Sequence, residues 1–152
     1  MGIPFGASLE EVRVATQELT CNPLEPDDTE GYDVLVCYHK VENIAIGFYL
    51  NKEGEDLVFV GALHSTIYSM EERARARYAS ALSAQIEKFG NPSESFKTPV
   101  SHKSIWADGQ TVFSVFVVGD KDGYSLLYTV VTKEFWDLKF AIQPTAIGGV
   151  PL

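Results

Sequence analysis

The stretch from Ser69 to Pro92, SMEERARARYASALSAQIEKFGNP, predicts the longest helix of the chain and divides the sequence into two halves. Ser69 and Glu72 have the spacing of a capping box, which marks a helix start. Gly90 suits the left-handed turn after a helix and Pro92 prevents continuation, so we expect the helix to end at Phe89. Its apolar residues recur every three or four positions and form one buried stripe: Met70, Ala74, Tyr78, Leu82, Ile86 and Phe89.

Three arginines in this stretch, Arg73, Arg75 and Arg77, stand out in an acidic chain. One interpretation is a patch that binds an anion or an acidic partner. The other is a solvated helix face on which Arg75 pairs with Glu71, four residues earlier. We favour the solvated face, because charged residues on an exposed helix are usually only hydrated.

The segments on either side of this helix predict two similar halves. Ser8 and Glu11 repeat the capping-box spacing and start a helix that ends near Leu19, and β-forming runs follow at 32–40, 44–50 and 57–63. The second half has such runs at 103–106, 111–118 and 124–130. We therefore expect one domain, residues 1–152, with an α+β fold. It consists of two tandem helix-plus-three-strand units, about 3–66 and 67–132, whose helices pack on one face of an antiparallel sheet.

The remaining segments are expected to be loops and a C-terminal extension. Prolines and charged residues predict loops at 22–31 and 90–102. In the extension, residues 133–152, alternating apolar side chains favour one more strand: Trp136, Leu138, Phe140 and Ile142. A helix that uses Phe135, Leu138 and Ile142 fits less well and stays an alternative. We interpret residues 144–152 as a loose end.

Composition limits the classes of function. The 152 residues carry a formal net charge of −9, which argues against nucleic acid as a partner because phosphate binding requires a basic surface. With 45% hydrophobic and 22% charged residues, the chain has the composition of a globular domain. No apolar run approaches the roughly 20 residues that span a bilayer, so we expect no transmembrane segment.

The compartment stays open at this point. The first residues, Met1 to Phe5, lack the basic and apolar regions of a signal peptide. We expect a periplasmic or envelope protein if a leader has been removed, and a cytoplasmic protein otherwise. Cys21 and Cys37 are too few for a disulfide scaffold. Either they pair in an oxidising compartment or Cys37 is a free buried thiol in a strand, and we favour the free thiol.

Two short motifs resemble a known superfamily. Gly6-x-Ser8-x-x-Glu11-Val12 and Phe89-Gly90-Asn91-Pro92 are similar to motifs of a bacterial envelope group. The group contains small lipoproteins of the BamE/SmpA type and β-lactamase-inhibitory proteins. The resemblance covers most of residues 3–132 and implies helices on one face of an antiparallel sheet and a protein-binding or scaffold role. The first half departs from the pattern, because Cys21-Asn22-Pro23 follows Leu19 where a glycine would stand, and no lipid-anchoring cysteine is present. No functional residue is transferred, since the matched positions are structural.

Catalytic motifs give little signal. The histidines, His39, His64 and His102, lack the spacing of metal ligands. No glycine-rich phosphate loop is present, and the segment 6–10 lacks the second glycine of a nucleophile elbow. We expect no metal, no cofactor and no catalytic residue. An enzyme whose site is assembled from distant residues stays an alternative.

The far face of the predicted sheet carries the candidate binding residues. If the helices cover the face with Ile44, Phe48 and Val115, the opposite face is apolar and aromatic, which is typical of an interface: Tyr49, Val58, Val60 and Phe116. Alternatively, the 137–152 tail or a second copy of the chain covers this face. We expect a non-catalytic protein-interaction, scaffold or inhibitor-type module that binds a protein partner or itself. A carrier of a small apolar ligand, with the tail as a lid, is the second hypothesis.

Overall fold

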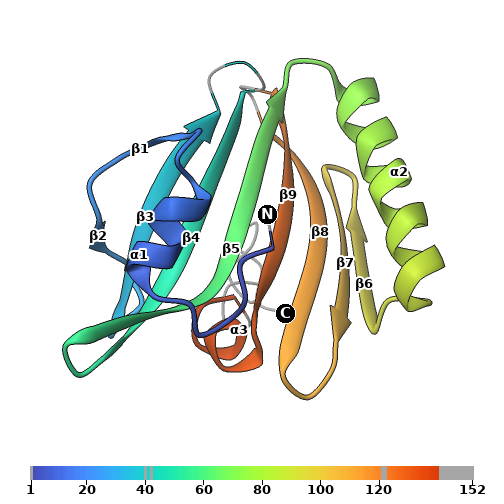
Figure 1. The fold of residues 1–152 in the computed structure, drawn as a ribbon. Helices are drawn as coiled ribbons and strands as arrows, with labels where there is room; N and C mark the ends of the chain where they lie inside the picture. The colour runs from blue at the N-terminus through green and yellow to red at the C-terminus, as the bar shows by residue number, and fades with distance from the viewer. Residues whose placement is uncertain (1, 40, 42, 121–122, 141–152) are drawn as a thin grey trace.

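The computed structural model describes residues 2–39, 41, 43–120 and 123–140, which form three helices and nine strands in one antiparallel sheet (Figure 1). The elements follow in this order: α1 (Leu9–Ala15), β1 (Thr20–Cys21), β2 (Glu25–Pro26), β3 (Tyr32–His39), β4 (Ile44–Glu53), β5 (Asp56–Tyr68), α2 (Glu71–Phe89), β6 (Glu94–Thr98), β7 (Ser101–Ala107), β8 (Thr111–Asp120), β9 (Gly123–Thr132) and α3 (Lys133–Lys139).

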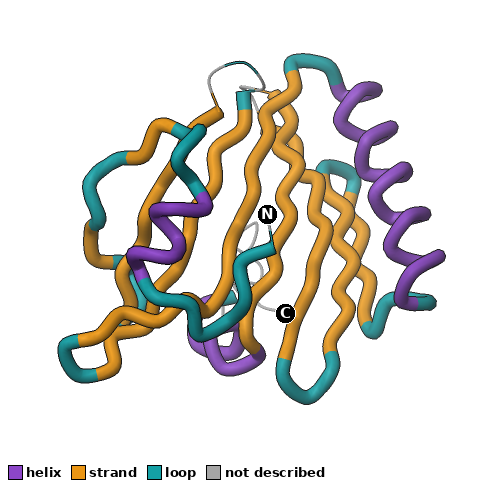
Figure 2. Tube along the Cα trace, viewed as in Figure 1, coloured by secondary structure: helices purple, strands orange, loops and turns teal. Residues whose placement is uncertain are grey.

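The sheet consists of two meanders joined in the middle. Strands β3 to β5 form one meander and β6 to β9 the other, and β5 pairs with β9 to give the order β1-β3-β4-β5-β9-β8-β7-β6. The short strand β2 also pairs with β3. Figure 2 shows the long central strands running continuously between short turns, as runs rich in β-branched and aromatic residues predict.

Helices cover both faces of this sheet. Helix α1 packs against Leu35, Phe48 and other side chains of β3, β4 and β5, and α2 packs against β7, β8 and β9 through Ala74 and Tyr78. We call the face that α1 and α2 cover the helix-side face. Helix α3 packs against the opposite face, the α3 face, through Phe135, Trp136 and Phe140. Successive side chains of a strand point to opposite faces of the sheet. Phe48 of β4 therefore packs in the core beneath α1, and the next residue, Tyr49, packs in the core beneath α3.

The expected fold of two tandem helix-plus-three-strand units with helices on one face is therefore wrong. The chain forms mostly sheet, five strands lie between α1 and α2, and a third helix follows β9 on the other face. The expected loops 22–31 and 90–102 contain β2 and β6, which are short strands at or near the sheet edges. Such strands form because a longer neighbour offers unpaired backbone groups, a long-range condition that local sequence does not show.

Helix α3 replaces the strand expected at 136–142. Thr132 caps the helix, and its hydroxyl accepts a hydrogen bond of 3.3 Å from the Phe135 N–H. Phe135, Trp136 and Phe140 are buried on one side, whereas Leu138 is 49% exposed. The alternation that suggested a strand is thus the coincidence of one exposed leucine between two buried aromatic residues. Residues 141–152, including Ile142 and the expected loose end, lie outside the described residues.

The long helix is confirmed, but its expected capping box is not. α2 begins at Glu71 with Met70 as an extended N-cap that makes no side-chain capping bond. Strand β5 continues to Tyr68 and leaves Ser69 in the turn. At the other end, Gly90 adopts φ 81° as expected. The capping box of Ser8 and Glu11 at the start of α1 is confirmed, with a bond of 3.1 Å from the Glu11 N–H to the Ser8 hydroxyl.

A bulge between β4 and β5 decides which side chains face α3. Leu50 pairs with Phe59 and Tyr49 pairs with Gly61, so Val60 is an extra residue on β5. Gly61 has φ 148°, and a Cβ atom there would collide with the backbone carbonyl oxygen of Val130. Because only glycine fits this position, the bulge is fixed by the sequence, and Leu63 beyond it faces α3 rather than α1.

Cys21 and Cys37 form a disulfide between β1 and β3, where they stand directly opposite each other. The favoured free thiol is therefore wrong. Within the described residues, no helix combines the length and the apolar composition that crossing a bilayer requires.

Candidate functional site

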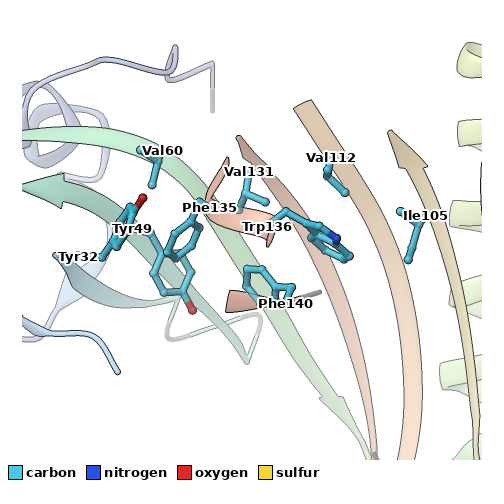
Figure 3. Close-up of a cluster of buried hydrophobic side chains, with 9 residues drawn as sticks. All are labelled: Tyr32, Tyr49, Val60, Ile105, Val112, Val131, Phe135, Trp136 and Phe140. Carbon is cyan, nitrogen blue, oxygen red and sulfur yellow. The ribbon is translucent and has the colours of Figure 1, made fainter. Parts of the chain in front are cut away.

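The structure separates the four residues that the sequence placed on one exposed face. Tyr49 and Val60 are 6% and 9% exposed and belong to the core beneath α3. Figure 3 shows the α3 side chains against them, and the Phe135 ring centroid lies 4.9 Å from that of Tyr49. Val58 lies near the start of β5, where it forms a bridge to Ser8 ahead of α1. Phe116 alone lies where α3 leaves the sheet uncovered, and it is half-buried.

The environment of Tyr49 is that of a core residue. Burial raises the pKa of its phenol to about 12, with further contributions from the charges of Asp27 and Asp28. The Lys139 Nζ lies 5.3 Å from the centre of its ring, a cation–π arrangement. These contacts bind α3 to the sheet, so the tyrosine has a structural role here.

Among the described residues, the side chains of the α3 face that α3 does not cover include one row across the sheet. The members of this row stand directly opposite one another on successive strands, from β3 to β6: Tyr38, Ala45, Ser65, Leu127, Phe116, Lys103 and Phe96. All are half-buried or exposed, and Tyr38 and Phe96 are 43% and 45% exposed. One row closer to α3, Ile105, Ser114 and Thr129 are buried. We call the first set the open row.

Lys103 is the chemically distinctive member of the open row. Its Nζ lies 5.4 Å from the ring centre of Phe116 and 5.0 Å from that of Trp136. Loss of solvent lowers the pKa of its ammonium group, and the charge of Glu94 acts in the opposite direction. Among the described residues Lys103 has no ion pair and no hydrogen bond from its side chain. A half-buried cation between two rings is thus available to a carboxylate from outside.

A hollow lies at the other end of the open row. It has a volume of about 300 Å³ and is lined by Tyr38, His39, Asn43, Ile44, Ala45, Ser65 and Ile67. The small side chains of Ala45 and Ser65, opposite each other on β4 and β5, leave this space. Ile67 beside them is 56% exposed. The hollow has the size to receive an aromatic side chain, and Ile44, Ala45 and Ile67 give it apolar walls.

Of the residues grouped here, the sequence predicted Phe116 as a candidate and did not single out Lys103, Phe96 or Trp136. These residues come from β7, β6 and α3, and only the register of the strands brings them beside Phe116. Phe96 stood in an expected loop, and Trp136 in an expected strand. A lysine inside a run of β-forming residues was the one available signal.

The three histidines are not brought together. His64 lies on β5, His102 on β7 and His39 at the end of β3, and two strands separate β5 from β7. His102 stacks on Tyr78 with ring centroids 4.5 Å apart, and burial lowers the pKa of both His64 and His102. In the part of the chain that the structure describes, no three His, Cys, Asp or Glu side chains are grouped as metal ligands.

Comparison with known proteins gives no match: no family model fits the chain, and no curated protein or solved structure is similar to it.

Proposed function

We propose that the chain is a protein-binding module and that the open row receives an extended segment of its partner. The half-buried Lys103 between Phe116 and Trp136, which has no ion pair with any described residue, is the observation that carries this proposal. Aromatic side chains beside a cation are typical of the residues that dominate binding energy at protein interfaces. The role is that of a scaffold or inhibitor-type module rather than a catalyst.

The two ends of the open row define what the partner carries. Strands lie about 4.8 Å apart, so the three steps from Ser65 to Lys103 span roughly 14 Å. An extended chain rises about 3.3 Å per residue, and roughly four residues cover that distance. The partner segment therefore has an aromatic side chain for the hollow and a carboxylate about four residues away for Lys103.

Selection from a displayed library of random peptides tests this proposal. We expect enriched sequences to pair an aromatic residue with Asp or Glu at that spacing. Lys103→Gln removes the cation, and Ala45→Phe fills the hollow from a half-exposed position. Each variant is expected to weaken binding about tenfold or more, since a charged hydrogen bond and a filled anchor pocket each contribute on that scale.

Lys97→Gln is the matched control. Lys97 is an exposed lysine on β6, next to Phe96 in sequence but on the opposite face of the strand. Its loss changes the net charge by the same amount and is expected to leave binding unchanged. Peptides that bind all three variants as well as they bind the unaltered chain would show that the open row is not the binding surface.

A further inference from the structure

A second hollow lies on the helix-side face, away from the open row. It has a volume of about 520 Å³ and lies between the end of β5 and helix α2. Tyr68 lines it from β5, and Arg73, Ala76, Arg77 and Ser80 line it from one side of α2. Among the described residues that line it, none is acidic. The two arginines thus bring positive charge to this hollow in a chain whose net charge is −9.

The three arginines of α2 differ in their contacts with the described part of the chain. Arg75 bonds to Glu71 at 2.8 Å and donates to the Pro99 carbonyl oxygen at 3.2 Å. Over the described residues, Arg73 and Arg77 have neither a hydrogen bond nor an ion pair. They stand four residues apart on the helix, where like charges repel each other. No partner among the described side chains offsets this repulsion.

Hydroxyl groups supplement the two guanidinium groups. Tyr68 and Ser80 line the hollow. Tyr128 on β9 is near enough to both Tyr68 and Arg77 that their charges affect its pKa, which burial raises. Tyrosine and serine hydroxyl groups can donate hydrogen bonds. The hollow therefore presents hydrogen-bond donors from β5 and α2.

We propose that this hollow binds the phosphate group of a small phosphomonoester. Arg73 and Arg77 each present a planar fork of N–H donors, which matches a phosphate oxygen pair in a bidentate arrangement. Tyr68 and Ser80 donate to the remaining oxygens. The doubly charged group relieves the repulsion between the two arginines, which a singly charged carboxylate does only in part. This site lies on the other face of the sheet from the open row and is independent of the proposed partner.

Calorimetric titration with phenyl phosphate at low ionic strength tests the site. Arg73→Gln and Arg77→Gln are each expected to weaken binding about tenfold or more, because each removes a charge-assisted bidentate contact. Arg75→Gln makes the same change in charge on α2, at a residue that does not line the hollow. This variant is expected to alter binding less than about twofold. Circular dichroism establishes that the three variants are folded.

The proposal is overturned if phenyl phosphate does not bind at millimolar concentration, or if Arg75→Gln weakens binding as much as Arg73→Gln. Benzoate is the charge control: equal affinity for benzoate would also overturn it, because a doubly charged group would then have no preference. Inorganic phosphate and vesicles of phosphatidylcholine with phosphatidic acid identify the source of the group. If inorganic phosphate binds and Arg73→Gln or Arg77→Gln weakens that binding, the ligand is a free phosphate. If the vesicles bind with the same dependence, the ligand is a lipid headgroup. Either result supports the site.

Discussion

At the scale of single residues, Asp27 and Lys139 form a buried ion pair that joins distant parts of the chain. The Lys139 Nζ lies 2.9 Å from both carboxylate oxygens of Asp27, and the two side chains are only 13% and 8% exposed. The residues are 112 positions apart, and the pair joins α3 to the segment before β3. Burial alone would raise the pKa of Asp27, but hydrogen bonds from Lys139 and Thr29 outweigh it and hold that pKa below its ordinary value.

This ion pair predicts a specific pH dependence. Because the folded-state pKa of Asp27 is depressed, its carboxylate stabilises the fold above the unfolded pKa of about 4, and that contribution is lost as pH falls through the folded-state value. Asp27→Asn is expected to lower the free energy of unfolding by about 3 kcal/mol at neutral pH, since it leaves a buried ammonium unpaired. The variant should then lose less stability on acidification than the unaltered chain.

Urea unfolding at several pH values measures both effects. Adding Lys139→Met to Asp27→Asn removes the orphaned charge and is expected to restore part of the lost stability. If Asp27→Asn is as stable as the unaltered chain at neutral pH, the pair does not hold α3 in place.

At the scale of elements, α3 decides which part of the sheet is core and which is surface. The ring centroid of Phe135 lies 4.6 Å from that of Tyr32, and its side chain is fully buried. Phe135→Ala is expected to lower the free energy of unfolding by about 3–5 kcal/mol, as a large-to-small change in a core does. Leu138→Ala, on the exposed side of the same helix, should change it by less than about 0.5 kcal/mol.

Chemical unfolding of both variants, with hydrogen exchange of the α3 amides, checks this prediction. Equal stability of the two variants would mean that α3 is not docked through Phe135. The same packing changes the meaning of the predicted site. We expect Tyr49→Asp to unfold the chain because it buries a charge beside Phe135, whereas a substitution in the open row changes only the surface.

The helices and strands differ in how well the sequence alone predicts them. The long helix and the alternating strands β4, β8 and β9 could be predicted because their signals are local and repeat over many residues. Strand β6 and helix α3 could not, since β6 depends on pairing with β7 and α3 imitates alternation over a single turn. In the candidate site Phe116 followed from the same alternation. Lys103 and Phe96 required the register of three neighbouring strands, which no local pattern contains.

At the scale of the whole molecule, the two faces of one sheet have different exposed chemistry. The α3 face presents an apolar row with one cation, and the helix-side face presents two arginines beside tyrosines. Strand β5 contributes to both, because Ser65 belongs to the open row and Tyr68 lines the hollow beside α2. One central strand therefore carries residues of both proposed sites.

The disulfide contributes to the stability of the whole molecule through the segment between α1 and β3. β1 pairs with β3 over only two residues, and the Cys21–Cys37 bond holds this pairing. The same segment carries Asp27, the anchor of α3, so its order affects both faces. The bond joins residues 16 positions apart, and closing a loop of that length contributes about 3 kcal/mol by restricting the unfolded chain.

The double variant Cys21→Ala, Cys37→Ala is therefore expected to have a free energy of unfolding about 3 kcal/mol lower than that of the oxidised chain. Urea unfolding with and without reductant measures this difference. Reductant should lower the stability of the unaltered chain towards that of the double variant and leave the double variant unchanged. An unaltered chain that is indifferent to reductant would mean that the cysteines are not bonded in solution, and the order of the segment around Asp27 would then depend on Lys139 and the β2–β3 pairing alone.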